Sequence, residues 1–190
     1  MRICTLGAVA GSVWLALALT ANSAALAQAR DFSRVRVLAV APFADENPLS
    51  RPLAESGAAR LSVLLRGGRL QVIDAARTSA QMKSLGVQAT ELISPSRTVA
   101  LGASLGADAV LTGRVIQIQQ EINRERADGT VAFSIEGRAV VDMRILEVET
   151  RLILWQEEMA CSVPSIASAA MECLVRQVAA RVAALSTGRN

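Results

Sequence analysis

Residues 131–145 read VAFSIEGRAVVDMRI, a regular alternation of apolar and polar residues. The other elements of the chain are predicted on either side of this stretch. Every odd position is apolar or small: Val131, Phe133, Ile135, Gly137, Ala139, Val141, Met143 and Ile145. Most even positions are polar or charged: Ser134, Glu136, Arg138, Asp142 and Arg144 among them. Successive side chains of a strand point to opposite faces, so this pattern predicts a long strand with one buried and one wet face. We expect Phe133, Ile135, Val141 and Met143 to lie beneath helices.

Further strands are predicted on either side of this one. Ala127-Asp128-Gly129 indicates a hairpin turn from a strand at residues 110–122, with residues 123–130 as the loop. Glu149-Thr150 indicates a second turn into a strand at residues 151–159. Upstream, the apolar runs at residues 34–42 and 70–73 predict two more strands.

Start and stop signals predict four helices. They are one capped by Ser50 and stopped by Gly67-Gly68, one capped by Asp74 and stopped by Gly86, one opened by Ser94-Pro95 and stopped by Gly106, and one opened by Pro164-Ser165. The element order is therefore βαβααβββα. It predicts an α/β fold, a single layered domain with a mixed four- to five-stranded sheet and helices packed on it.

The first 29 residues predict export. Arg2 precedes an apolar run, and Ala27-Gln28-Ala29 forms a cleavage site, so residues 1–29 are a predicted signal peptide and residues 30–190 the single domain. The alternative, a membrane anchor, is disfavoured because polar residues from Thr20 onward cut the run short of a bilayer span. No cysteine stands at the cleavage point. We predict a periplasmic protein without a lipid anchor or a transmembrane segment, and association with the outer membrane stays open.

The residue types exclude most catalytic chemistry. The chain has no histidine, which removes imidazole bases and ligands, and its one lysine, Lys83, lacks a serine at the spacing of Ser-Lys enzymes. Carboxylates remain: Glu147, Glu149, Glu157 and Glu158. Adjacent acids on a strand point to opposite faces, so Glu157 and Glu158 cannot easily share a substrate. We predict no enzyme, no cofactor and no metal.

Two cysteines, Cys161 and Cys173, follow the signal peptide. An oxidising compartment favours a disulfide between them, and two separate buried thiols are the alternative.

The charge balance, 20 basic against 17 acidic residues, together with few aromatic residues, predicts no nucleic-acid binding. Protein partners are expected instead. Arginine is common at binding hot spots, so Arg124, Arg126 and Arg151, which lie near the turns, are the predicted contributors.

Three segments, in this order, resemble a known family. They are the strand VLAVAPF at residues 37–43 with the later LQVID at residues 70–74, the element GASLGADAVLTG at residues 102–113, and the hairpin at residues 141–155. The chain resembles the curli-secretion component family (CsgG) and its relatives, which include lipoprotein activators of penicillin-binding proteins and the amino-terminal domain of TolB.

The resemblance implies a non-enzymatic protein-interaction domain of the cell envelope. Implied partners are outer-membrane or peptidoglycan-synthesis proteins, and a homo-oligomer stays open. The alternatives are an oligomeric outer-membrane secretion or assembly component, and a carboxylate-dependent hydrolase of envelope glycans. The chain departs from the family pattern in three ways: it lacks a lipobox cysteine, its hairpin loop at residues 123–130 is short between charged strands, and Arg151 replaces a usual glycine.

Overall fold

The computed structural model describes residues 32–127 and 130–188; for residues 125–127 and 130–132 it describes the backbone alone. The predicted signal peptide, residues 1–29, lies outside the described residues. Within the described ranges, no helix combines the length and the apolar character that crossing a bilayer requires.

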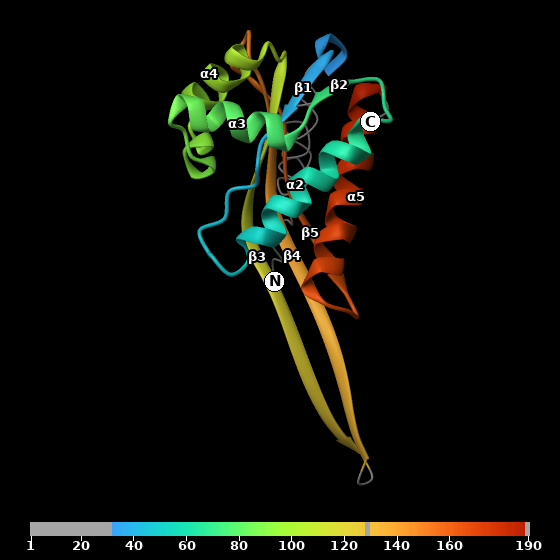
Figure 1. Ribbon diagram of the computed structural model, residues 1–190. Helices are drawn as coiled ribbons and strands as arrows, with labels where there is room; N and C mark the ends of the chain where they lie inside the picture. The colour runs from blue at the N-terminus through green and yellow to red at the C-terminus, as the bar shows by residue number, and fades with distance from the viewer. Residues whose placement is uncertain (1–31, 128–129, 189–190) are drawn as a thin grey trace, which may run out of the picture.

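A mixed sheet of five strands runs through the domain in the order β2-β1-β3-β4-β5 (Figure 1). The strands are β1 (Val37–Val40), β2 (Gln71–Ile73), β3 (Ala109–Ala127), β4 (Thr130–Glu147) and β5 (Ile153–Val163). β1 pairs in parallel with β2 and with β3, whereas β4 is antiparallel to both β3 and β5. The predicted α/β class with a mixed sheet is therefore confirmed.

Helices cover both faces of the sheet (Figure 1). One face carries α2 (Arg51–Leu65) and α5 (Ala167–Ser186), and the other carries α3 (Ala75–Leu85) and α4 (Pro95–Leu105). Two short 3-10 helices, η1 (Phe32–Arg34) and η2 (Ala89–Ile93), complete the described helices. They were not predicted, because segments of three to five residues are too short to show a helical period.

The helix ends show which of the predicted caps operate. The side chain of Asp74 accepts a hydrogen bond from the backbone N–H of Arg77 and caps α3. Gly86 and Gly106 end α3 and α4 at φ of 65° and 67°, the left-handed region that glycine adopts without strain. Ser50 stands at the N-cap position of α2 as predicted, but its side chain does not cap the helix, since its hydroxyl donates to the carbonyl of Asn47 upstream.

The larger core lies between the sheet and the α2–α5 layer. Val141 and Met143 of β4 are fully buried there, together with Leu174 of α5. A smaller core under α3 and α4 includes Leu101 and Val110. Each such side chain contributes about 1.5–3 kcal/mol by leaving water.

Two of the four residues expected beneath helices are exposed. Val141 and Met143 are buried as predicted, but Phe133 is 66% exposed and Ile135 is 39% exposed. All four still point to one face of β4, as the alternation predicts. The error lies in the helical cover, because β4 continues past the point where α5 begins.

Both central strands are also longer than predicted. β3 continues to Ala127 rather than ending near residue 122, and Ala127 pairs with Thr130, so most of the expected loop is strand. Charged residues do not end a strand whose faces meet water, which explains the difference.

β5 starts at Ile153, after a turn in which Arg151 adopts φ of 60°. That left-handed conformation explains why a glycine is usual at this position in the resembling family.

Candidate functional site

Beyond the body of the sheet, β3 and β4 continue as a two-stranded extension (Figure 1). β5 ends where Val163 pairs with Gly137, so within the described chain residues 121–127 and 130–136 pair with each other alone. We call these two segments the arm. A two-stranded ribbon buries little of its own surface, which leaves the side chains of the arm available to other molecules.

One face of the arm is apolar. Ile122 lies opposite Ile135, and Phe133 lies opposite Arg124, so these four side chains share a face. Ile122 is 63% exposed, and Ile166, at the start of α5, is 48% exposed. Ile122, Arg124, Phe133, Ile135 and Ile166 together are called the arm face. Exposed apolar side chains that gather on one face are typical of interaction surfaces.

Gly137 joins the arm to the body. A Cβ at Gly137 would lie 2.5 Å from the carbonyl oxygen of Ile166, so only glycine allows α5 to start directly against the strand. Gln120, the residue opposite Gly137, accepts a hydrogen bond through Oε1 from the N–H of Ala167 at 3.4 Å. The helical cover of this sheet face therefore ends at Gly137.

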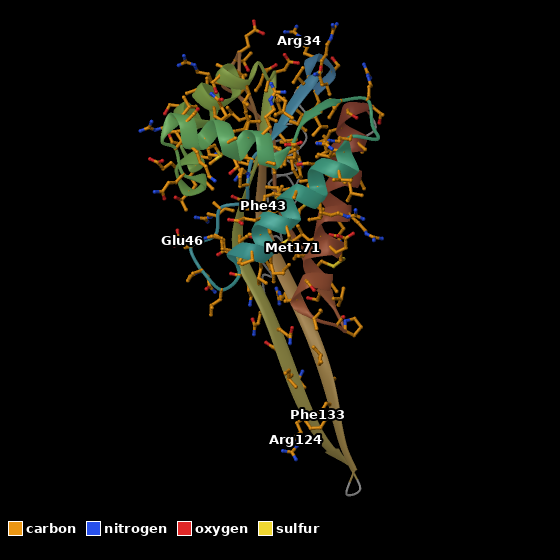
Figure 2. The ribbon with its side chains drawn as sticks, in the orientation of Figure 1. Arg34, Phe43, Glu46, Arg124, Phe133 and Met171 are labelled. Atoms are coloured by element: carbon orange, nitrogen blue, oxygen red, sulfur yellow. A yellow bond between two sulfur atoms is a disulfide. The ribbon has the colours of Figure 1, made fainter. Side chains whose placement is uncertain are left out.

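Arg124 adds positive charge to the arm face. Its guanidinium carbon lies 5.8 Å from the centroid of the Phe133 ring, and the two side chains lie together near the far end of the arm (Figure 2). A cation at this distance from an aromatic face gains about 0.5–1 kcal/mol at an exposed site. The arm face therefore combines apolar surface with a cation fixed beside it.

The opposite face of the arm is polar. Glu121 lies opposite Glu136, and Asn123 lies opposite Ser134. The carboxylate of Glu121 accepts a hydrogen bond from the side-chain amide of Gln119, the next residue along that face. We call Glu121, Asn123, Ser134 and Glu136 the reverse face. The arm thus presents an apolar, cationic side and a polar, acidic side.

The three predicted partner-binding arginines do not form one patch. Arg124 belongs to the arm face, and the backbone of Arg126 pairs with Val131 near the tip, while its side chain lies outside the described residues. Arg151 stands in the turn at the opposite end of β4. At about 3.3 Å per residue, the length of β4 between Phe133 and Glu147 is roughly 45 Å. A partner that contacts Arg124 would have to be large to reach Arg151 as well.

The sequence analysis missed Ile122, Phe133, Ile135 and Ile166 as surface residues. Element lengths could have indicated them. α5 has 20 residues, or about 30 Å of helix, whereas β4 has 18 residues, or about 60 Å of strand. A terminal helix of that length can cover only about half of such a strand, so part of its apolar alternation has to project.

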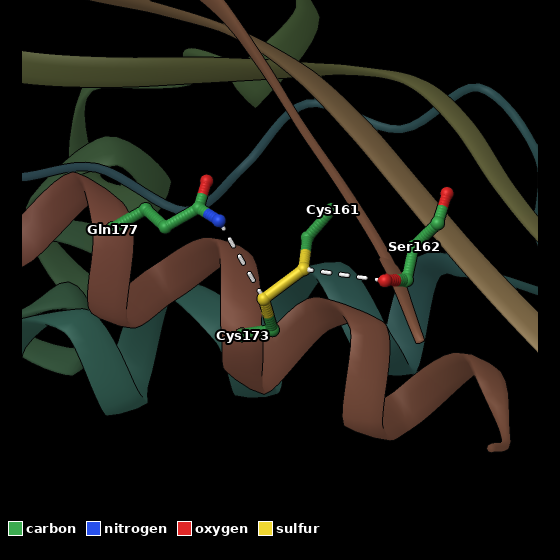
Figure 3. Close-up of a disulfide and its surroundings, with 4 residues drawn as sticks. All are labelled: Cys161, Ser162, Cys173 and Gln177. Atoms are coloured by element: carbon green, nitrogen blue, oxygen red, sulfur yellow. Dashed lines mark hydrogen bonds between the residues drawn. A yellow bond between two sulfur atoms is a disulfide. The ribbon is translucent and has the colours of Figure 1, made fainter. Parts of the chain in front are cut away.

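A disulfide between Cys161 and Cys173 joins the end of β5 to the first half of α5 (Figure 3). The two Cα atoms are 6.1 Å apart, within the range that a disulfide spans. The side-chain amide of Gln177 donates to the sulfur of Cys173 at 3.6 Å. The predicted pairing is therefore present, and it fixes the part of α5 that lies nearest the arm.

The candidate catalytic carboxylates do not converge. Glu157 and Glu158 project to opposite faces of β5, Glu147 is buried and accepts a hydrogen bond from the Thr150 hydroxyl, and Glu149 is exposed. Across the described ranges, no group of three or more cysteine and acidic side chains is placed to hold a metal ion.

The pKa of Glu172 is lowered from its usual value, and the residue has a structural role. A hydrogen bond from Arg176 at 3.0 Å, and then contacts with Arg60 at 3.3 Å, lower the pKa of Glu172. A general acid needs a raised pKa, so the shift has the wrong sign for that role. Instead the ion pair with Arg60 links α2 to α5.

Comparison with known families identifies the group. Residues 58–161 match the family described as peptidoglycan-synthase activator LpoB. The chain belongs to the LpoB family. This membership makes it a cell-envelope protein, and the matched span contains both strands of the arm. A search of curated proteins found no significant match.

Solved structures support the fold. Lipoprotein GNA1162 from Neisseria meningitidis is 18% identical, with a TM-score of 0.56 over 78% of this chain and 98% of that one. The hypothetical protein CT253 from Chlamydia trachomatis is 17% identical, with a TM-score of 0.52 over 80% of this chain and 98% of that one. With the family match, these structures confirm the resemblance to the superfamily of CsgG and the LpoB activators.

Proposed function

We propose that this LpoB-family protein is a non-enzymatic envelope factor that binds and activates a peptidoglycan synthase, and that it docks through the arm face. The observation that carries the proposal is the arm face itself, where Ile122 and Phe133 are each more than half exposed and Ile135 and Ile166 are exposed in part. The family description supplies the partner, and the matched span includes the arm.

The composition of the arm face suits a binding hot spot. Aromatic and arginine side chains dominate the energetics of most protein interfaces, and here Phe133 and Arg124 lie in contact near the tip. Docking would also order a ribbon that is marginally stable by itself. Activation by such contact needs no catalytic group, which agrees with carboxylates that do not converge.

The test is glycan-chain polymerisation by a purified peptidoglycan synthase, with the protein titrated in. Phe133→Ser should raise the half-maximal concentration at least about 10-fold, the effect of losing one hot-spot side chain. Ser134→Ala, one residue away on the reverse face, is the matched control and should behave as the wild type. Activation that is unchanged by Phe133→Ser would refute docking through the arm face.

The arm also suggests a second candidate function, that of an envelope component that assembles with copies of itself. The cationic arm face of one copy complements the acidic reverse face of another, and such a head-to-tail contact closes into rings or extends into filaments. Light scattering at increasing concentration distinguishes the two functions. A monomer that still activates the synthase supports docking, and a ring that Arg124→Glu dissolves supports assembly.

For the export route, we propose that the mature protein begins near Arg30 in the periplasm and carries no acyl chain. The Ala27-Gln28-Ala29 site and the absence of a cysteine beside it support this start. GNA1162, by contrast, is described as a lipoprotein. Intact-mass spectrometry of the protein from an envelope fraction measures both the start and any lipid, and an added lipid mass would refute the proposal.

A further inference from the structure

The arm face is a continuation of the sheet face that α5 covers. Along β4, residues 133, 135, 137, 139, 141 and 143 alternate onto that side, and Ala139, Val141 and Met143 are fully buried beneath the helices. The helical layer stops at Gly137, while the apolar strand face continues through Ile135 and Phe133. In proteins of this architecture, the usual cover for such a face is another helix.

The dimensions of the arm fit one helix. From Gly137 to Thr130 the strand extends about 23 Å, the length of a helix of about 15 residues. Ile135 and Phe133 are separated by about 6.6 Å along the strand, close to the roughly 6 Å between helix positions i and i+4. A helix with an ordinary apolar stripe would therefore meet these two anchors on successive turns.

The charges select an acidic helix. Arg124 lies beside Phe133 at the far end of the face. At the near end, α5 begins at Ala167 after the apolar N-cap residue Ile166, its first turn holds no acidic residue, and the N–H of Ala167 donates to Gln120. The helix dipole favours negative charge there. Both ends of the arm face thus attract carboxylates, whereas the reverse face, with Glu121 opposite Glu136, repels them.

We propose that the arm face binds an acidic amphipathic helix of the partner protein, laid end to end with α5 along β4. This inference rests on the proposed docking function and specifies the element that docks. The helix places apolar residues against Ile122, Phe133 and Ile135, and carboxylates beside Arg124 and the first turn of α5. The complex extends the existing helical layer by one element.

A designed probe tests the inference on the mature chain. The probe is a synthetic helical peptide of about 18 residues with leucine on one face and glutamate flanking it, and its matched control has every glutamate replaced by lysine. Backbone amide shifts map the contact, and the titration gives both affinities. We expect shifts at Ile122, Phe133, Ile135 and Ile166, and at least about a 10-fold preference for the acidic peptide, which weakens as salt is raised.

Two variants sharpen the result. Arg124→Glu should reverse the preference towards the lysine peptide, and Phe133→Ser should weaken binding of the acidic peptide at least about 10-fold. Ser134→Ala should leave it unchanged. Both mutated side chains on the arm face are exposed, so a far-ultraviolet spectrum and a melt verify that each variant folds.

Three outcomes overturn the inference. They are equal affinity for both peptides, shifts confined to the reverse face, and an absence of peptide binding in a chain that binds anionic vesicles or associates with itself. If the acidic peptide does not bind but Phe133→Ser still abolishes synthase activation, docking through the arm face is supported and the acidic helix is refuted. If the peptide binds but Phe133→Ser leaves activation intact, the proposed function fails instead.

Discussion

Within β4, the half in the body and the half in the arm share a pattern but differ in burial. Met143 and Phe133 occupy equivalent odd positions on one face, yet Met143 is fully buried and Phe133 is 66% exposed. The backbone of both halves pairs with β3 in the same antiparallel way. The difference arises from the layer above, since helices reach only as far as Gly137. Alternation therefore specifies the face of a residue, and the length of the neighbouring helix specifies its burial.

The largest contrast should appear between truncations in the two halves. Met143→Ala removes a fully buried side chain and should lower the free energy of unfolding by about 2–5 kcal/mol. Phe133→Ala removes a larger but exposed side chain and its contact with Arg124, and should change it by no more than about 1 kcal/mol. Urea unfolding of both variants measures the two values. Comparable losses would show that the arm packs against the body after all.

The next largest effect on stability should come from the disulfide that fixes α5 near Gly137, where the helical cover ends. Replacing both cysteines, Cys161→Ser with Cys173→Ser, frees a loop of 12 residues and should cost about 2–3 kcal/mol on the chain-entropy model. Thermal melts with and without a reductant measure the loss. In the double variant a reductant should have no effect, whereas it should lower the melting temperature of the wild type. Identical melts of wild type and variant would contradict a stabilising role.

A substitution at Gly137 tests where the helical cover of β4 ends. Gly137→Ala places a Cβ about 2.5 Å from the Ile166 carbonyl oxygen, so α5 or the strand has to shift, at a cost of about 1–3 kcal/mol. Gly67→Ala is the control, because nothing lies within 4 Å of the position that its Cβ would occupy. Chemical denaturation compares the two. If Gly137→Ala were as well tolerated as Gly67→Ala, the helical cover would not be held at this point.

The smallest effect should come from the other end of β4. Arg151 holds a left-handed conformation that strains a residue with a Cβ, so Arg151→Gly should stabilise the fold by up to about 1 kcal/mol. Arg151→Ala keeps the Cβ and removes the charge, so it should give no such gain. Melting temperatures distinguish these outcomes. A gain with alanine equal to that with glycine would assign the effect to charge rather than to the backbone.

Much of the body could be predicted from local signals. Asp74, Gly86 and Gly106 marked helix ends because capping acts within a few residues. The mixed sheet followed from element order, and the disulfide followed from the expected compartment. What failed depends on distant parts of the chain: the extent of cover over Phe133 is set by where α5 starts, more than thirty residues later.

The candidate site was predicted only in part. Arg124 was selected for its residue type and its place near a turn, and it does lie on the arm face. The apolar members of that face were assigned to the core because apolar alternation is the same signal in both settings. Arg151 was grouped with Arg124 although β4 separates them, since proximity to a turn says nothing about which end of a strand the turn joins.

The exposed arm also separates residues that determine partner choice from residues that determine stability. Side chains such as Ile122 and Phe133 contact little of the body, so replacing them changes what the protein can recognise while leaving the rest of the domain as stable as before. Buried positions of the same strand lack that freedom. Descendants of such a protein could therefore diverge in partner choice through a few substitutions near one tip, with the remaining sheet and its helices inherited intact.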